Sequence, residues 1–398
     1  MQIAQRVQNI KESPTLAMAA KAQKMKAEGL DIIDLSTGEP DFDTPEHIKQ
    51  AAIGALQCGF TKYTAVTGTK TLKEAIISKF YQENNMRFSQ DEVIVSTGAK
   101  HVFYNLCMAY LNQNDEVIIP APFWVSYPDM VTLAGAVPIL LTCPAHQGYK
   151  LTPSQLSAAI TPKTRLLVIN SPANPTGATY SLDELKALAK VLIQHPDILI
   201  ASDDIYEHIL MKDNRAYNIL DAEPALKQQT LLINGVSKAF AMTGWRIGYA
   251  GGPRTIIRAM GMIQSQSTSN PCSIAQVAAQ AALTGDKTCL KTKLTTFRQR
   301  HDLLIRRFDQ IDGLQYLPAQ GAFYAFIDAS DAITRLAKQG KITACDDLAL
   351  TDYLLDQYHI AVVPGSAFGM AKHFRISFAT RTDQLEKALD RMDIAFSA

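Results

Sequence analysis

The 398-residue chain lacks several patterns that would assign it to a class at once. No two of its six cysteines stand at Cys-x-x-Cys spacing, so the common zinc and dithiol motifs are absent. No apolar run approaches the roughly 18 residues of a membrane-spanning helix. Neither the phosphate-binding pattern Gly-x-x-x-x-Gly-Lys-Ser/Thr nor the dinucleotide pattern Gly-x-Gly-x-x-Gly occurs. A P-loop enzyme and a nicotinamide dehydrogenase are therefore disfavoured.

An excess of charge of either sign is also missing. The formal net charge of +1 argues against a general attraction to nucleic acid or to anionic membranes. Residues 1–11 are polar and contain no apolar core of a signal peptide, and scattered cysteines are typical of free thiols in a reducing compartment. We therefore expect a cytoplasmic protein with no nucleic-acid or membrane partner.

The middle of the chain alternates short β-rich runs with helical patterns. The runs predict strands at residues 92–95, 116–119, 137–141, 165–169, 198–201 and 231–233. Pro120 and Pro122 are expected to end the second of them. Ser181 and Glu184 have the form of a capping box that opens a helix ending near residue 195. This alternation predicts an α/β fold with a mainly parallel sheet between helices, and with ligands bound beyond the carboxyl ends of the strands.

After about residue 290 the pattern changes. Helical stretches at residues 291–309 and 347–358 lie among strand-like runs at 321–326, 360–363 and 373–378, which predicts a smaller α+β domain. The length of the chain also favours two cores. We expect a large domain over residues 46–290 and a small domain made of residues 1–45 and 291–398.

The most informative segment is residues 235–248, where Lys238 stands among small residues between two strand-like runs. An ordinary solvated charge is the alternative to a functional lysine here. Partial burial near a cationic phosphate anchor, for which Arg246 is the candidate, lowers the pKa of an amine and makes it nucleophilic. A Schiff-base lysine beside a phosphate anchor is what pyridoxal phosphate requires. The segment therefore predicts imine chemistry with that cofactor.

Three further loops follow predicted strands and carry polar residues. Residues 96–100 open a helix whose N-terminus can bind phosphate, unless the segment is only a tight turn. Asn174 lies in a rigid turn rich in proline, from which its amide can donate to a phenolate oxygen. Asp203 can pair with a protonated pyridine nitrogen or cap a helix, and Tyr206 can reach the oxygen of the same ring.

Trp124 and Arg375 complete the set of candidates. Trp124 follows a strand, where it either stacks on a flat heteroaromatic ring or fills the core. Arg375 lies in an alternating apolar run, so its guanidinium needs a partner. We expect that partner to be a bidentate substrate carboxylate, with a structural salt bridge as the alternative.

Taken together, these segments resemble the class I/II aminotransferases, the aspartate aminotransferase type of the fold-type-I pyridoxal-phosphate enzymes. The lysine segment is similar to the attachment site of that family throughout, and Ser-Pro-x-Asn-Pro-Thr-Gly, Asp-x-x-Tyr and Arg-Ile-Ser occur in the family's order. Lys-Ala-Phe-Ala-Met-Thr-Gly-Trp-Arg-Ile-Gly-Tyr-Ala resembles the bacterial and archaeal subgroup of aspartate aminotransferases nearly residue for residue, as does Pro-x-Trp-Val-Ser-Tyr-Pro-Asp-Met. The resemblance extends over residues 36–375.

The resemblance implies a role for each matching residue. Lys238 forms the Schiff base and moves the substrate proton, Asp203 binds the pyridine nitrogen, and Tyr206 and Asn174 bind the ring oxygen. The other implied cofactor contacts are Trp124 on the ring and Gly98, Ala99, Lys100, Arg246 and Ser237 at the phosphate.

The resemblance also implies how substrates and a second subunit take part. Arg375 and the backbone at Gly38 bind the α-carboxylate, with Trp124 and Asn174 beside them. Tyr63 is similar to the tyrosine that reaches the phosphate of the neighbouring subunit. The family pattern therefore implies a homodimer with shared active sites.

Substrate choice depends on basic residues near the far end of the substrate. Residues 265–269, where animal-type enzymes place a second arginine, contain none, but in the resembled subgroup a lysine at the position of Lys100 binds the distal carboxylate. Some members also use prephenate, with a basic residue that Lys11 resembles. We expect an aspartate aminotransferase that works by ping-pong transfer between L-aspartate and 2-oxoglutarate. A bifunctional aspartate/prephenate enzyme, or an aromatic aminotransferase, is the alternative.

Overall fold

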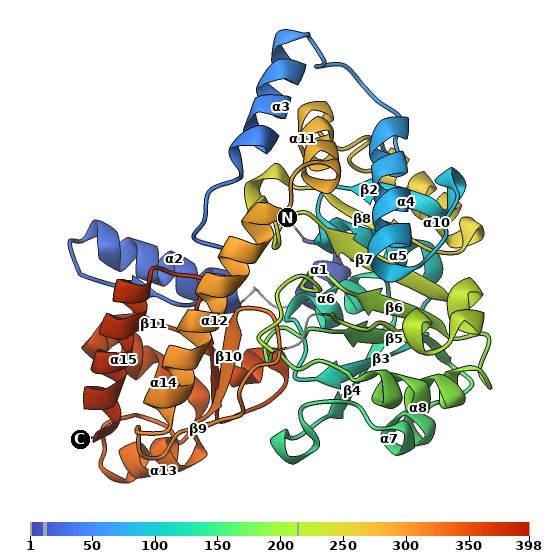
Figure 1. Ribbon diagram of the computed structural model, residues 1–398. Helices are drawn as coiled ribbons and strands as arrows, with labels where there is room; N and C mark the ends of the chain where they lie inside the picture. The colour runs from blue at the N-terminus through green and yellow to red at the C-terminus, as the bar shows by residue number, and fades with distance from the viewer. Residues whose placement is uncertain (1, 11–13, 213–214, 398) are drawn as a thin grey trace.

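A seven-stranded sheet runs through the larger part of the chain that the structure describes, which is residues 2–10, 14–212 and 215–397 (Figure 1). The structure is a computed structural model. In spatial order the strands are β2 (Val93–Ser96), β8 (Gly248–Gly251), β7 (Thr230–Gly235), β6 (Leu199–Asp203), β5 (Thr164–Asn170), β3 (Glu116–Ala121) and β4 (Val137–Thr142). Only β8 runs antiparallel to its neighbours in this sheet of described residues. The predicted α/β fold with a mainly parallel sheet is confirmed.

Helices cover both faces of this sheet, so its strands are buried on both sides (Figure 1). One face carries α5 (Ala99–Tyr110), α6 (Ser126–Leu133) and α10 (Arg254–Ser265). The other carries α3 (Glu46–Gln57), α4 (Lys70–Asn84), α7 (Pro153–Ala159), α8 (Leu182–Leu192) and α11 (Ser273–Thr284). Successive side chains of a strand point to opposite faces, so Ile94 joins the first core while Val93 and Val95 join the second.

A second, smaller sheet lies in the C-terminal part, in the order β12-β13-β10-β9 among the described residues. Its antiparallel strands are β12 (Val363–Pro364), β13 (His373–Ser377), β10 (Tyr324–Asp328) and β9 (Gln315–Tyr316). The surrounding helices are α12 (Thr288–Phe308), α13 (Ser330–Lys338), α14 (Asp347–Tyr358) and α15 (Thr382–Ser397). Figure 1 shows this group beside the large sheet, with α12 reaching from one to the other.

The N-terminal segment packs on the C-terminal part. It contains α1 (Gln5–Gln8), α2 (Pro14–Ala27) and β1 (Ile33–Asp34), and β1 pairs in parallel with β11 (Ile360–Ala361). Ile33 and Leu35 belong to the same core as α12 and α15. The exact division of the chain into domains at residues 45 and 290 stays a prediction.

Two expectations about strands are wrong in detail. Pro120 lies inside β3 rather than ending it. Since β3 pairs with β5 only over Glu116–Ile118, a proline farther along the strand, which lacks an N–H, costs no hydrogen bond to β5. The run 360–363 is two strands, since β11 pairs with β1 while β12 pairs with β13. The capping box is confirmed, with Ser181 Oγ accepting from the Glu184 N–H at 3.3 Å. No helix in the described ranges is long and apolar enough to cross a membrane.

Candidate active site

The carboxyl ends of β5, β6 and β7 open onto a cavity of about 340 Å³. Parallel α/β sheets bind ligands at this edge. Most of the predicted site residues line the cavity: Gly38, Ala99, Lys100, Trp124, Asn174, Asp203, Tyr206, Ser237, Lys238, Arg246 and Arg375. The small sheet supplies Arg375, so the cavity lies between the two sheets.

Lys238 follows β7 and extends toward the N-terminal segment of the chain. Its Nζ donates a hydrogen bond to the Gly38 carbonyl oxygen at 2.6 Å. Burial, and then the positive charges of Arg375 and Arg246, lower the pKa of the amine to about 8. A substantial fraction of the amine is thus neutral near physiological pH and can act as a nucleophile or a base.

Asp203 is the last residue of β6 and is held rigidly at the wall of the cavity. Its Oδ2 accepts from the Tyr127 hydroxyl at 2.5 Å, and its Oδ1 accepts from the Ile205 N–H at 3.3 Å. Burial raises the pKa of this carboxyl. No basic side chain among the described residues forms an ion pair with it, and no helix starts there, so the helix-cap alternative is not seen. A cationic ring nitrogen would provide the missing counter-charge.

Arg375 lies in the middle of β13 and is 2% exposed. Its Nη1 donates to Asn174 Oδ1 at 3.0 Å, and its Nη2 donates to the Ser36 carbonyl oxygen. Its Nε has no hydrogen-bond partner, and no carboxylate in the described part of the chain pairs with the guanidinium. Burial lowers the pKa of this guanidinium because it disfavours the charged form. A bound carboxylate would therefore stabilise the buried charge. The structural salt bridge considered from the sequence is not present.

The N-terminus of α5 forms an anion cradle with Arg246. Gly98 is the N-cap, with φ of 85°, and Ala99 and Lys100 begin the helix. A Cβ at position 98 would lie 2.3 Å from Arg246 Nη2, so only glycine lets the guanidinium rest on this turn. Backbone N–H groups at a helix N-terminus beside an arginine suit a phosphate. Ser237 is buried and also lines the cavity.

Lys100 extends over Trp124 at the mouth of the cavity. Its Nζ lies 5.1 Å from the centroid of the Trp124 ring. Partial burial, and then the charge of Arg246, lower the pKa of Lys100. Trp124 packs edge-on against Tyr127 and keeps one face toward the cavity lining, so it is not a fully buried core residue.

Tyr63 does not line the cavity of this chain. Tyr63 is 92% exposed in the loop between α3 and α4. Lys11 lies outside the described residues.

The sequence also left several lining residues unnoticed, among them Tyr127, Tyr324 and Thr15. Tyr127 lies in the first turn of α6, three positions after Trp124, which precedes that helix. Tyr324 contacts Arg375, but only the pairing of β10 with β13 shows this. Thr15 lines the cavity from the start of α2, with a hydroxyl oxygen that has no partner in the described ranges.

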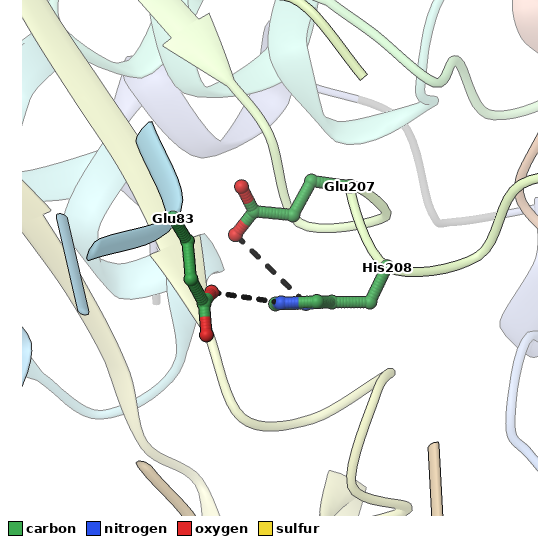
Figure 2. A group of neighbouring side chains, drawn as sticks. All are labelled: Glu83, Glu207 and His208. Atoms are coloured by element: carbon green, nitrogen blue, oxygen red, sulfur yellow. Dashed lines mark hydrogen bonds and ion pairs between the residues drawn. The ribbon is translucent and has the colours of Figure 1, made fainter. Parts of the chain in front are cut away.

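An ion-pair network holds the loop that carries Tyr206 (Figure 2). Glu207 accepts from Asn84 Nδ2 at 2.8 Å, from Asn234 Nδ2 at 2.5 Å and from Lys79. Glu83 pairs with His208 at 2.9 Å and with Lys287. The carboxylates and the histidine could in principle hold a metal ion, but two lysine ammonium groups already neutralise them. The network is therefore an anchor of this loop to α4.

Three features meet at the ligand-binding edge of the large sheet: an amine of lowered pKa, an anion cradle, and a buried arginine without an ion pair in the described part of the chain. Together they define a class of enzymes. It is the class of enzymes whose lysine engages a phosphorylated aldehyde and whose arginine takes a carboxylate.

The chain belongs to the family of class I and II aminotransferases, whose model matches residues 30–392. It is 55% identical to the aspartate/prephenate aminotransferase of Nitrosomonas europaea, over 98% of this chain and 99% of that protein. It is similar to the crystal structure of the aspartate aminotransferase from Rhizobium meliloti, with a TM-score of 0.94 and 47% identity over 100% of this chain and 99% of that one. The aspartate aminotransferase from Thermus thermophilus with maleate gives 0.93 and 41%, over 99% and 100%. The protein is therefore a pyridoxal-phosphate-dependent aminotransferase that acts on amino acids and 2-oxo acids.

Proposed function

We propose that this protein is an aspartate aminotransferase that transfers the amino group of L-aspartate to 2-oxoglutarate by a ping-pong mechanism. The observation that carries the proposal is the buried, carboxylate-free guanidinium of Arg375, which lies close enough to Lys238 to lower the pKa of its amine. An amino acid bound by its α-carboxylate at Arg375 brings its amino group and α-proton toward Lys238. Names borne by relatives, among them aspartate/prephenate and aspartate aminotransferase, support the same substrate class.

The residues at the cavity fit pyridoxal phosphate. Arg246 and the turn at residues 98–100 would hold the phosphate, with Ser237 beside them, because Gly98 leaves room for the guanidinium against the helix N-terminus. Asp203, which forms no ion pair in the described part of the chain, would hold the ring nitrogen. The Tyr206 hydroxyl and the Asn174 amide would hold the ring oxygen, and Trp124 would cover the ring face.

When bound, the cofactor supplies an aldehyde for Lys238 and an electron-accepting ring for the substrate α-carbon. The chain does the positioning and the proton transfer. The free Nζ of Lys238 would remove the α-proton as a general base. Its pKa of about 8 suits that task because roughly a tenth of the amine is neutral at pH 7 and about half at pH 8. Arg375 and Asn174 orient the α-carboxylate so that this proton faces the lysine.

Lys100 is proposed to bind the distal carboxylate of aspartate and glutamate. It supplies a cation at the cavity mouth, on the side of Trp124. The Thermus relative was solved with maleate, which is a four-carbon dicarboxylate.

Prephenate is a second proposed amino acceptor, because the relative from Nitrosomonas europaea is named for both activities. The test of both proposals is an assay of purified protein with a panel of amino donors, against 2-oxoglutarate and against prephenate. Turnover with aromatic donors but none with aspartate would support the aromatic alternative.

We also propose a homodimer with shared active sites. Tyr63 is fully available to a second copy, and Leu56 and Phe60 expose apolar surface just before it. Sedimentation or size-exclusion measurements test the assembly, and a monomer with full activity would contradict it.

A further inference from the structure

Tyr324 contacts three parts of the active site at once. Its hydroxyl lies 2.9 Å from the Tyr206 hydroxyl. The guanidinium carbon of Arg375 lies 4.5 Å from the centroid of its ring. A Cβ at Gly38 would lie 2.1 Å from its hydroxyl oxygen, so the backbone that accepts the Lys238 hydrogen bond packs directly against it.

The small sheet places Tyr324 on the same face as Arg375. Phe326 pairs with Arg375 in the β10–β13 register, and Tyr324 is two residues before Phe326, so its side chain leaves the same face of the sheet. The guanidinium carbon of Arg375 also lies 5.0 Å from the centroid of the Phe368 ring. Two aromatic rings and the hydrogen bonds to Asn174 and Ser36 hold Arg375 before any substrate binds.

The hydroxyls of Tyr206 and Tyr324 form one hydrogen bond with each other. Burial raises the pKa of both Tyr206 and Tyr324, so both hydroxyls stay protonated. A phenol carries one hydrogen, and one of the two is used in the bond between the hydroxyls. The pair therefore presents one remaining donor to a ligand oxygen, and the bond between the hydroxyls polarises that donor.

We propose that Tyr324 is a positioning residue of the active site, whose hydroxyl orients and polarises the Tyr206 donor and whose ring orients Arg375 for a carboxylate. This inference rests on the proposed function, in which Tyr206 serves the cofactor ring oxygen and Arg375 the substrate. The hydroxyl and the ring of Tyr324 have separate tasks, so substitutions can remove the two tasks one at a time.

The test uses Tyr324→Phe, which keeps the ring and removes the hydroxyl, and Tyr324→Met, which removes both. Two quantities are measured on purified protein without turnover: the dissociation constant of maleate, and the pH midpoint of the absorbance of bound cofactor. Maleate binding to the cofactor-free protein, followed by its thermal shift, gives a readout that does not depend on the cofactor.

We expect Tyr324→Phe to bind maleate within about twofold of wild type and to raise the absorbance midpoint by at least about 0.3 unit, because a weaker donor leaves the ring oxygen more basic. We expect Tyr324→Met to weaken maleate binding about tenfold with and without cofactor. In a Tyr206→Phe background, Tyr324→Phe should add little further shift of the midpoint. The charged groups around Lys238, namely Arg375, Glu39, Arg246 and Asp203, are unchanged in each variant.

An unchanged midpoint in Tyr324→Phe, or an additive shift in the double variant, would overturn the role of the hydroxyl. Wild-type maleate affinity in Tyr324→Met would overturn the role of the ring. A lower melting temperature with both binding readouts unchanged would make Tyr324 merely structural and would also overturn the inference. If wild-type protein shows no cofactor absorbance at all, the proposed function fails instead. Should Tyr324→Met not fold, Phe368→Leu tests the aromatic support of Arg375 with the same maleate readout.

Discussion

Lys238 donates a hydrogen bond to the carbonyl oxygen of Gly38, 200 residues earlier in the chain. The bond joins the end of the large sheet to the N-terminal segment, which itself packs on the small sheet. The nucleophile and the residues that would hold the substrate carboxylate are thus set by contacts between the two sheets.

Gly38 is predicted to tolerate no side chain. Because an added Cβ would lie 2.1 Å from the Tyr324 hydroxyl, Gly38→Ala must displace either the loop or the tyrosine, and overpacking of this kind costs about 1–3 kcal/mol. We expect KM for aspartate to rise about tenfold, since Tyr324 supports Arg375.

Gly54→Ala is the matched control, because nothing lies within 4 Å of a Cβ at that helical position. It should leave KM unchanged. Equal kinetics in Gly38→Ala and Gly54→Ala would refute the steric argument.

Lys100 is predicted to discriminate between amino donors. Lys100→Ala removes a charge-assisted contact worth about 1.5–3 kcal/mol to the distal carboxylate, so kcat/KM for aspartate should fall at least tenfold. Alanine has no distal carboxylate and should be affected much less. The ratio of the two values is the measurement, and an equal loss for both donors would remove Lys100 from this role.

Glu83 is predicted to make the free energy of unfolding depend on pH in the acidic range. Burial opposes ionisation of this carboxyl, but His208, Lys79 and Lys287 outweigh it and lower its pKa from 4.5 to about 2. The stabilisation is therefore complete above pH 4.5 and is lost as pH falls toward 2, and it amounts to something on the order of 3 kcal/mol.

Denaturant unfolding at several pH values checks this. Glu83→Gln should be less stable than wild type at neutral pH, and the difference should shrink below pH 4.5. The exposed Glu28→Gln serves as the control. A difference between Glu83→Gln and wild type that stays constant with pH would contradict the assignment.

Tyr63 is predicted to act in the neighbouring subunit. Tyr63→Ala and Lys238→Ala should each impair both sites of their own dimers. A mixed dimer contains one site with both native residues, so co-expression of the two variants should restore activity at limiting cofactor. Activity that merely averages the two parents would show that Tyr63 and Lys238 do not share a site between subunits.

The sequence predicts six strands of the large sheet because those strands are short, mostly apolar runs with clear boundaries, as at Val93 and Leu199. It gives no range for β8, whose sequence Gly-Tyr-Ala-Gly contains no β-branched residue. The sequence does not predict a strand boundary that depends on which neighbouring strands pair with it. Pro120 remains in β3 because the strand still pairs with β4 there, while its pairing with β5 ends at Ile118. Residues 360–363 divide because residues 360–361 pair with β1 and residue 363 pairs with β13. No local pattern carries this information.

The candidate site can likewise be predicted from the sequence only in part. Lys238 and Asp203 can be found from the sequence because they lie after and at the ends of strands that meet at one edge of a parallel sheet. Tyr324 cannot, because its contact with Arg375 depends on the register of two antiparallel strands. The place of Tyr63 depends on a second chain, which the sequence of one chain indicates only through its resemblance to a family.

The most direct test of the account is reduction of the cofactor-loaded protein with borohydride, followed by peptide mapping. Reduction traps a lysine that is joined to an aldehyde. The account predicts a single pyridoxyl-modified residue, Lys238, and no trapped adduct in Lys238→Ala although that variant still binds the cofactor. Modification at Lys100 or another lysine in place of Lys238, or no modification in wild type, would contradict it.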